Sequence, residues 1–122
     1  MSDDTITQWL HELTTCTACP LRHEGNRGPT RFSGPIDSPI MFVGEGPGGV
    51  EDEYGVPLVG PSGQLLDKAL WSVGLTRDHV YVTNIVKCRP HNNRTPTLEE
   101  GKACANIHLV KEIEIVKPTV IV

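Results

Sequence analysis

The sequence predicts an α/β fold in which a small parallel sheet is flanked by helices. Three short apolar or β-branched segments indicate strands, at residues 40–44, 80–86 and 119–122. Segments with helical signals separate them, and strands that alternate with helices normally form a parallel sheet with right-handed crossovers. A chain of 122 residues is long enough for one modest domain. We therefore expect residues 1–122 to form a single domain.

The helices are predicted from apolar spacing and capping signals. Residues 4–13 carry an apolar stripe with the i, i+3, i+4, i+7 spacing of an amphipathic helix. A second helix is expected to begin at a cap formed by Ser62 and to end at Gly74. A third should begin at the capping box of residues 97–100 and end before Pro118. The inward-facing residues predicted for the second and third helices are Leu65, Leu66, Ala69, Leu70, Val73, Ala103, Ile107 and Val110.

The segment that follows the first strand, residues 44–63, is the first candidate for a functional site. It contains seven glycines and three prolines, a density that predicts a loop and not the interior of a helix. Glycine lets backbone amides approach a ligand closely, and Glu51 and Asp52 lie within the same segment. By glycine content alone, the segment resembles a generic phosphate or nucleotide cradle.

Four cysteines form the second candidate site. Cys16 and Cys19 are two residues apart, Cys88 follows the second predicted strand, and Cys104 lies in the second turn of the next helix. The chain opens with no signal-peptide pattern and has no apolar run of roughly 20 residues, so a cytoplasmic location is expected. Cysteines in a reducing compartment favour metal ligation or redox chemistry over disulfides. Their spacing leaves zinc, an iron–sulfur cluster and buried thiols open.

The distribution of charge bears on a nucleic-acid partner. The net charge of −4 argues weakly against nucleic-acid binding. The basic side chains nevertheless gather near the cysteines, and these two groups could form one positive lip or could balance an anionic metal–thiolate centre. The residues concerned are Arg22, His23, Arg27, Arg31, Lys87, Arg89, Arg94 and Lys102.

A set of short motifs then points to one family. In chain order they are Gly44-Glu45-Gly46-Pro47-Gly48, Glu51-Asp52, Gly55-x-Pro57, Val59-Gly60-x-Ser62-Gly63-x-Leu65-Leu66 and Thr83-Asn84-x-Val86-Lys87-Cys88-Arg89-Pro90. In this order, and over essentially the whole chain, they resemble the family 4, iron–sulfur uracil-DNA glycosylases of the uracil-DNA glycosylase-like superfamily. The resemblance implies a three-layer α/β domain with four strands, of which this chain has three. The C-terminal part expected for the family is then missing.

The resemblance also assigns the cysteines. Cys16, Cys19, Cys88 and Cys104 occupy the positions that hold a [4Fe–4S] cluster in that family, which favours iron–sulfur over zinc. The implied partner is uracil-containing DNA, and the implied process is base excision repair. A related domain is fused to some phage DNA polymerases.

The same comparison implies a uracil pocket at the carboxyl ends of the strands. Glu45 would be the catalytic residue that positions or activates water, beside the Gly46 backbone. Asn84 would read the uracil edge, and the amides of Ser62 and Gly63 would face a phosphate. These assignments are expectations that follow from the resemblance.

Two departures from the family pattern bear on activity. Leu58 stands where the family usually has an aromatic residue that stacks on uracil. The histidine-containing second motif has no counterpart, because neither His91 nor His108 matches it. Two functions are therefore expected: a glycosylase that excises uracil when complete, and an inactive glycosylase-like adaptor that binds DNA or a replication or repair protein. No membrane partner is expected.

Overall fold

The computed structural model describes residues 2–16, 20–23 and 25–122. Within them the sheet has three strands, β1 (Ile40–Gly44), β2 (Tyr81–Asn84) and β3 (Val120–Ile121). The strand order is β2-β1-β3, and β1 runs parallel to both neighbours. The predicted parallel α/β sheet is confirmed.

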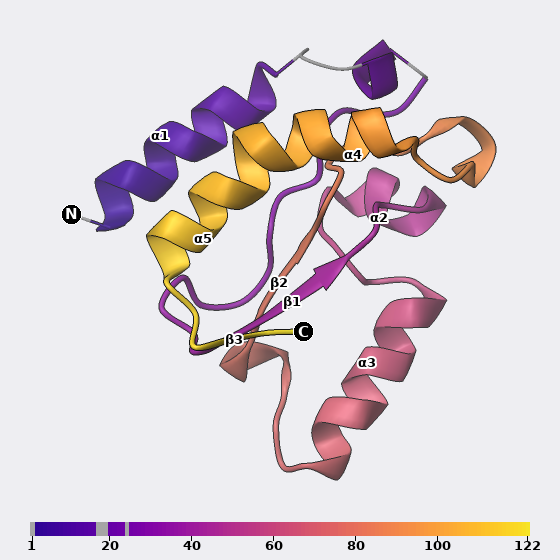
Figure 1. Ribbon diagram of the computed structural model, residues 1–122. Coiled ribbons are helices and arrows are strands. Elements are labelled where there is room, and N and C mark those ends of the chain that lie inside the picture. Colours follow the sequence, from indigo (N-terminus) through magenta and orange to yellow (C-terminus); the bar gives the residue numbers. More distant parts are fainter. Residues whose placement is uncertain (1, 17–19, 24) are drawn as a thin grey trace.

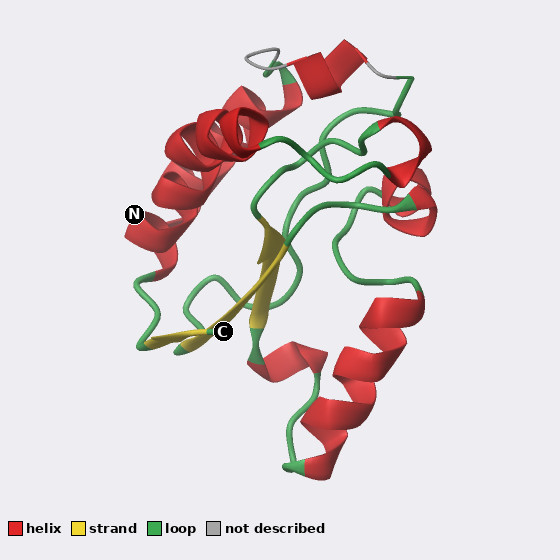
Figure 2. Cartoon of the chain, turned by 45° about the vertical axis from the view of Figure 1, so that its right-hand side comes forward, coloured by secondary structure: helices red, strands yellow, loops and turns green. Residues whose placement is uncertain are grey.

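The longer helices lie on both sides of this sheet (Figures 1 and 2). On one side, α1 (Ser2–Thr14) packs beside a continuous rod made of α4, a π-turn and α5. The other side carries α3 (Pro61–Ser72). The segments of the rod are Leu98–Cys104, Ala105–Leu109 and Val110–Val116, and short helices occur at Gly49–Tyr54 (α2), Pro20–His23, Arg77–His79 and His91–Asn93.

The strands join two cores because successive strand residues point to opposite faces. Met41 and Tyr81 are buried with Trp9 of α1 and Val116 of α5. Val82 is buried on the opposite face with Leu70 of α3. The result is a helix–sheet–helix arrangement with one core on each side of the sheet. No helix in the described part of the chain is long and apolar enough to cross a membrane.

The predicted inner face of the α4–α5 rod is wrong at Ile107 and Val110. The buried side chains recur every four residues and, beyond the capping residue Glu100, include two polar groups, His108 and Glu112. Ile107 and Val110 are exposed instead. The π-helical segment at 105–109 changes which residues of the rod point inward. His108 and Glu112 can be buried because each has a buried partner. Hydrophobic spacing cannot detect either effect. The full inner row is Glu100, Cys104, His108, Glu112 and Val116.

The second helix also differs from its prediction. Ser62 does not cap α3, because Gly60 is the N-cap and Pro61 is the first helical residue. Proline is well tolerated at this position, where its missing N–H has no intrahelical role. Leu70 is buried as expected and Leu66 packs against the same core. The predicted inner residues that are exposed instead are Leu65, Ala69 and Val73.

The glycine-rich segment is not wholly a loop. Residues 49–54 form α2, and Gly55 ends it in the left-handed conformation with φ 75°. Residues 50–54 contain no glycine or proline, so this stretch can close helical turns. By contrast, the capping box at Thr97 is confirmed, since its hydroxyl accepts the Glu100 amide at the start of α4.

Candidate functional site

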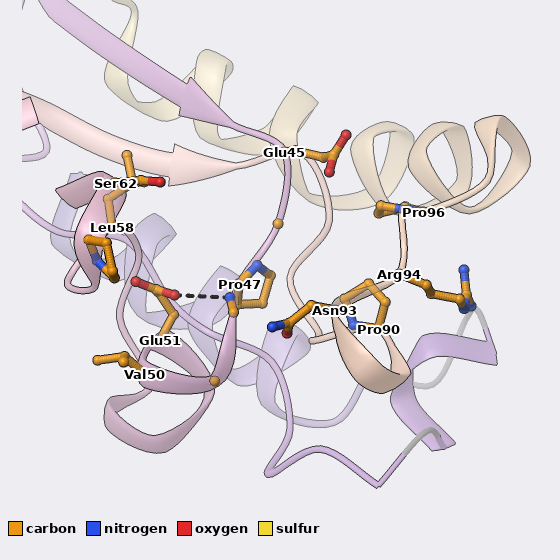
Figure 3. Close-up of a pocket in the computed structure, with 14 residues that line it drawn as sticks. Glu45, Pro47, Val50, Glu51, Leu58, Ser62, Pro90, Asn93, Arg94 and Pro96 are labelled. Atoms are coloured by element: carbon orange, nitrogen blue, oxygen red, sulfur yellow. Dashed lines mark hydrogen bonds between the residues drawn. The ribbon is translucent and has the colours of Figure 1, made fainter. Parts of the chain in front are cut away.

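A cavity of about 480 Å³ opens at the carboxyl end of β1. This volume lies within the range of ligand pockets, roughly 300–1,000 Å³. The position also fits the rule that open parallel sheets bind ligands beyond the carboxyl ends of their strands. One wall is the glycine-rich segment and the other is the loop that leads to α4 (Figure 3). The lining residues are Glu45, Gly46, Pro47, Gly48, Gly49, Val50, Glu51, Leu58, Pro61, Ser62, Pro90, Asn93, Arg94 and Pro96.

Four of the predicted site residues line this cavity: Glu45, Gly46, Leu58 and Ser62. Glu45 is exposed and lies toward the Pro96 end, whereas Leu58 and Ser62 lie at the other end (Figure 3). Glu45 also borders a second, largely apolar cavity of about 360 Å³. The carboxylate therefore stands between two hollows of the surface.

Asn84 and Gly63 do not line the large cavity, although the prediction grouped them with it. Asn84 ends β2 directly beside Gly44, its partner on β1. Its side chain is 2% exposed, and neither atom of its amide has a hydrogen-bond partner among the described residues. Buried polar groups without partners are rare and call for an explanation. A ligand that enters past Gly44 would provide one.

Gly44 leaves room for the observed position of the Asn84 side chain. A Cβ at this position would lie 2.4 Å from Oδ1 of Asn84, which is closer than any real contact. The glycine that precedes Glu45 thus makes room for the Asn84 amide. Gly44 therefore links the two predicted site residues, because it precedes Glu45 in the chain and pairs with Asn84 across the sheet.

Glu51 organises the glycine-rich wall. Its carboxylate accepts hydrogen bonds from the amides of Gly48 (2.9 Å), Val59 (3.0 Å) and Gly60 (2.6 Å), one of which is dashed in Figure 3. Partial burial acts to raise the pKa of Glu51, but the backbone hydrogen bonds outweigh it and hold that pKa below its usual value. The Glu51 carboxylate is thus a negative charge that holds Gly48 close to Val59 and Gly60, the two ends of this wall.

Arg94 and Glu100 hold the opposite wall. Both terminal nitrogens of Arg94 donate to the carboxylate of Glu100 at 2.8 Å, and the same carboxylate accepts the Thr97 amide at 2.9 Å. The Arg94 hydrogen bonds lower the pKa of Glu100 to about 2, although burial acts in the opposite direction. A paired and capped carboxylate therefore anchors the loop at the start of α4.

The Glu100 pair predicts a pH dependence of folding. Because the folded-state pKa lies below the ordinary value of 4.5, the pair stabilises the fold above pH 4.5 and is lost as the pH falls toward 2. We expect the melting temperature of the wild type to fall more steeply over this interval than that of Glu100→Gln. Glu99→Gln, which alters an exposed neighbour, is the control. Parallel melting curves for wild type and Glu100→Gln would contradict the prediction.

Lys87 does not belong to a basic surface, contrary to its grouping with the lip residues. Its ammonium is buried and pairs with the Glu112 carboxylate. It also donates to the Thr83 hydroxyl (2.6 Å) and to the Asn84 carbonyl (2.6 Å). Tyr81 donates its hydroxyl to Glu112 at 2.5 Å, and burial followed by the Glu112 charge raises the pKa of Tyr81. This buried network fixes the end of β2 that carries Asn84.

Three cysteines from distant segments meet at one small cavity beneath this network. Cys88 and Cys104 are buried, Cys16 is half-buried, and all three line that cavity. The fourth predicted ligand, Cys19, lies outside the described residues. Within the described part of the chain, no group of three or more His, Cys, Asp or Glu side chains is arranged to hold a metal ion.

His108 lines the same cavity, and its surroundings define its tautomer. Its Nδ1 accepts a hydrogen bond from Nε1 of Trp9 at 3.1 Å. Burial, followed by the Lys87 charge, lowers the pKa of His108 to about 4, so the ring is neutral at pH 7. The ring proton is then on Nε2, which has no partner among the described residues. Cysteine thiols and an N–H donor without a partner among the described residues are together compatible with a thiolate-bound cluster.

Comparison with known proteins decides the family. Residues 32–122 match the model of the uracil DNA glycosylase superfamily. The chain belongs to this superfamily.

The superfamily members most informative for this chain are type-4 uracil-DNA glycosylases. That of Thermotoga maritima is 51% identical over 107 residues, which cover 88% of this chain and 55% of that protein. That of Pyrobaculum aerophilum is 48% identical over 112 residues, with 91% and 56% covered. A DNA polymerase of Bacillus phage SP01 is 34% identical over 100 residues, 81% of this chain and 11% of the polymerase. The chain spans about half the length of the glycosylases that it matches.

Within this superfamily site, the structural role of Glu51 was not expected from sequence. The spacing Gly48-x-x-Glu51 is the signal that could have found it, because a glutamate at the third helical position commonly bonds back to the N-cap amide. The motif match included Glu51 without assigning a function to its carboxylate. Its bonds to Val59 and Gly60 depend on tertiary structure.

Proposed function

We propose that this chain binds uracil-containing DNA and, as an iron–sulfur uracil-DNA glycosylase, takes part in hydrolysis of the uracil N-glycosidic bond during base excision repair. The observation that carries the proposal is the pairing of Gly44 with Asn84 across β1 and β2. It sets a buried amide without a partner among the described residues next to the backbone that leads into Glu45 and the cavity. The names of the glycosylase relatives support the same function.

Asn84 is the group proposed to recognise the base. Enzymes that act on a base take it out of the stack and read its hydrogen-bonding edge. An amide can donate to O4 of uracil and accept from N3–H, so a single asparagine satisfies that edge. Binding uracil would in turn give both amide atoms of Asn84 the partners that the described residues do not supply.

Glu45 is the group proposed to act on the reacting atoms. Cleavage of the bond between N1 of uracil and C1′ of the sugar leaves positive charge on the sugar, which a nearby carboxylate stabilises. Water then bonds to C1′, the electron pair of the broken bond stays on uracil, and Glu45 takes a proton from the water. An exposed carboxylate at the rim of the cavity is accessible for this role.

Two further residues would complete the pocket. Leu58 offers an apolar surface to the uracil ring, where aromatic stacking would contribute roughly 1–3 kcal/mol. Ser62 lies in the first turn of α3, whose amides favour a phosphate. Gly63 is buried behind Leu58, so its proposed contribution is its amide and not a surface.

Cys16, Cys19, Cys88 and Cys104 are the residues that would hold the [4Fe–4S] cluster. Three of them share one cavity, and thiolates around a multi-atom cluster stand farther apart than around a single ion, which fits the lack of a compact ion site among the described residues. The cluster would tie α1, the loop after β2 and α4 together. Stoichiometric iron and acid-labile sulfide in the purified chain would support it, and stoichiometric zinc would contradict it.

Replacing Glu45 with alanine tests the enzymatic role. The chain is incubated with a single-stranded oligonucleotide that contains one deoxyuridine, and abasic sites are revealed by alkali. We expect cleavage by the wild type and a loss of about 100-fold or more in Glu45→Ala, the effect of removing one electrostatic catalyst. Glu53→Ala, an exposed acid on α2, should leave the rate unchanged.

The adaptor function is the second candidate, and the match to a phage DNA polymerase favours it. In that case the chain would bind the uracil-containing oligonucleotide or a replication protein without cleaving DNA. Binding without alkali-sensitive product, at protein concentrations well above that of the oligonucleotide, would identify the adaptor. Failure to bind DNA at all would contradict the glycosylase and the DNA-binding adaptor, and would leave only an adaptor that binds a replication or repair protein.

A further inference from the structure

Leu58 has an unusual backbone for a residue at the mouth of the cavity. Its φ is +51°, in the left-handed region that non-glycine residues rarely adopt. The residue lines the cavity and also packs against the core formed by Leu70, Val80 and Val82. Backbone strain at such a site persists only where surrounding groups hold it in place. Two charged side chains do so here.

Arg77 holds the carbonyl side of Leu58. One terminal nitrogen of its guanidinium donates to the Leu58 carbonyl. Its Nε donates to Asp67 of α3 at 2.6 Å, and its other terminal nitrogen lies 3.4 Å from the Ser33 hydroxyl. The arginine therefore reaches from the turn before β2 to the segment that carries Leu58. Because the guanidinium is planar, the directions of its hydrogen bonds are fixed relative to one another.

Glu51 holds the other side of the same turn. The amides of Val59 and Gly60, which directly follow Leu58, both donate to its carboxylate. Leu58 thus lies between a cation that binds its carbonyl and an anion that binds the next two amides. The Leu58 carbonyl and the Val59 amide belong to one peptide unit, so the two opposite charges orient that unit from its two ends.

α3 presses against the same carbonyl from behind. A Cβ at Gly63 would lie 1.9 Å from the Leu58 oxygen and 3.0 Å from the Arg77 guanidinium. Only glycine leaves room for the carbonyl and its arginine partner. The Leu58 backbone is consequently held by Arg77, Glu51 and α3, in addition to the packing of its side chain against the core.

We propose that Arg77 and Glu51 are positioning residues that hold the Leu58 side chain against the base in the cavity. This inference rests on the proposed function, because it assumes that the cavity receives a base. It assigns to Arg77, which does not line the cavity, an influence on base retention through Leu58. It also makes position 58 a rigid wall and not a mobile loop residue.

The experiment compares two labelled single-stranded oligonucleotides by fluorescence anisotropy. One contains a single deoxyuridine and the other an abasic analogue at the same place. The Kd for the abasic oligonucleotide divided by the Kd for the deoxyuridine oligonucleotide measures the base-dependent part of binding. A left-handed leucine is disfavoured by an amount equivalent to roughly a five- to thirtyfold change in an equilibrium constant. We expect Arg77→Ala to lower this ratio by about fivefold or more, or to one where the wild-type ratio is itself below five.

Two controls separate positioning from general effects. Lys68→Ala removes an exposed cation from α3 and should weaken both oligonucleotides alike, which leaves the ratio unchanged. In a Leu58→Ala background, Arg77→Ala should no longer change the ratio, since the side chain it positions is gone. Glu51→Gln is the second variant if Arg77→Ala does not fold, and it should lower the ratio in the same background-dependent way.

The outcomes distinguish the two levels of the proposal. If the wild type binds both oligonucleotides equally, the cavity does not receive a base, and the proposed function and this inference both fail. If the wild type discriminates but Arg77→Ala does so equally well, only the positioning role fails. If Arg77→Ala lowers the Kd ratio equally in the wild-type and Leu58→Ala backgrounds, the positioning role also fails.

Discussion

Replacing Glu112 with glutamine is expected to lower the free energy of unfolding by about 3–5 kcal/mol. The substitution preserves the shape of the side chain but removes the counter-charge of Lys87. The Lys87 side chain is only 2% exposed, so its ammonium then lies buried and unpaired. Removal of one partner from a buried ion pair costs more than the pair itself contributes, because the remaining charge has lost its solvation. Urea denaturation followed by circular dichroism measures the loss.

A second variant shows whether the loss comes from Lys87. In a Lys87→Met background no ammonium remains at this position, so Glu112→Gln should cost far less there than in the wild type. Equal losses in the two backgrounds would mean that the ion pair is not the source. The Tyr81 hydroxyl keeps a hydrogen-bonding group opposite it in both variants, because it can donate to the glutamine oxygen or accept from the glutamine NH2.

Gly63→Ala is expected to destabilise the protein by about 1–3 kcal/mol, although alanine normally stabilises a helix. The new Cβ would meet the Leu58 carbonyl at 1.9 Å, and backbone atoms cannot move aside as a flexible side chain could. Thermal or urea denaturation provides the measurement. The same substitution should weaken the contact between Arg77 and Leu58.

Gly101 provides a matched control within α4. A Cβ at Gly101 would meet only the Ile85 side chain, at 3.8 Å, which is an ordinary contact. Gly101→Ala should therefore stabilise the protein by about 0.5–1 kcal/mol through helix propensity. A gain in stability for Gly63→Ala as well would show that Leu58 does not lie against α3.

Local sequence signals predicted the elements whose ends are set by local chemistry. The strand at residues 40–44 and the helix start at Thr97 agree with the structure, because an apolar run and a capping box act within a few residues. α1 extends the predicted helix at residues 4–13 to Ser2–Thr14.

The same signals could not place the inner face of α4 and α5. His108 is buried there against Trp9, which lies 99 residues away in the sequence. Glu112 is buried against Tyr81, 31 residues away. Polar residues at these positions are typical of an exposed helix face, so only the distant partners make their burial favourable.

Sequence by itself determined the parallel α/β class and, through the motifs around Glu45 and Asn84, the superfamily. Those properties follow from short segments whose residue order is specific. Tertiary structure alone decided that Asn84 has a buried amide without a partner among the described residues, and that Leu58 is held in a left-handed turn by Arg77 and Glu51. These features depend on charges and backbone atoms that meet only when distant segments pack. No local pattern can report such contacts.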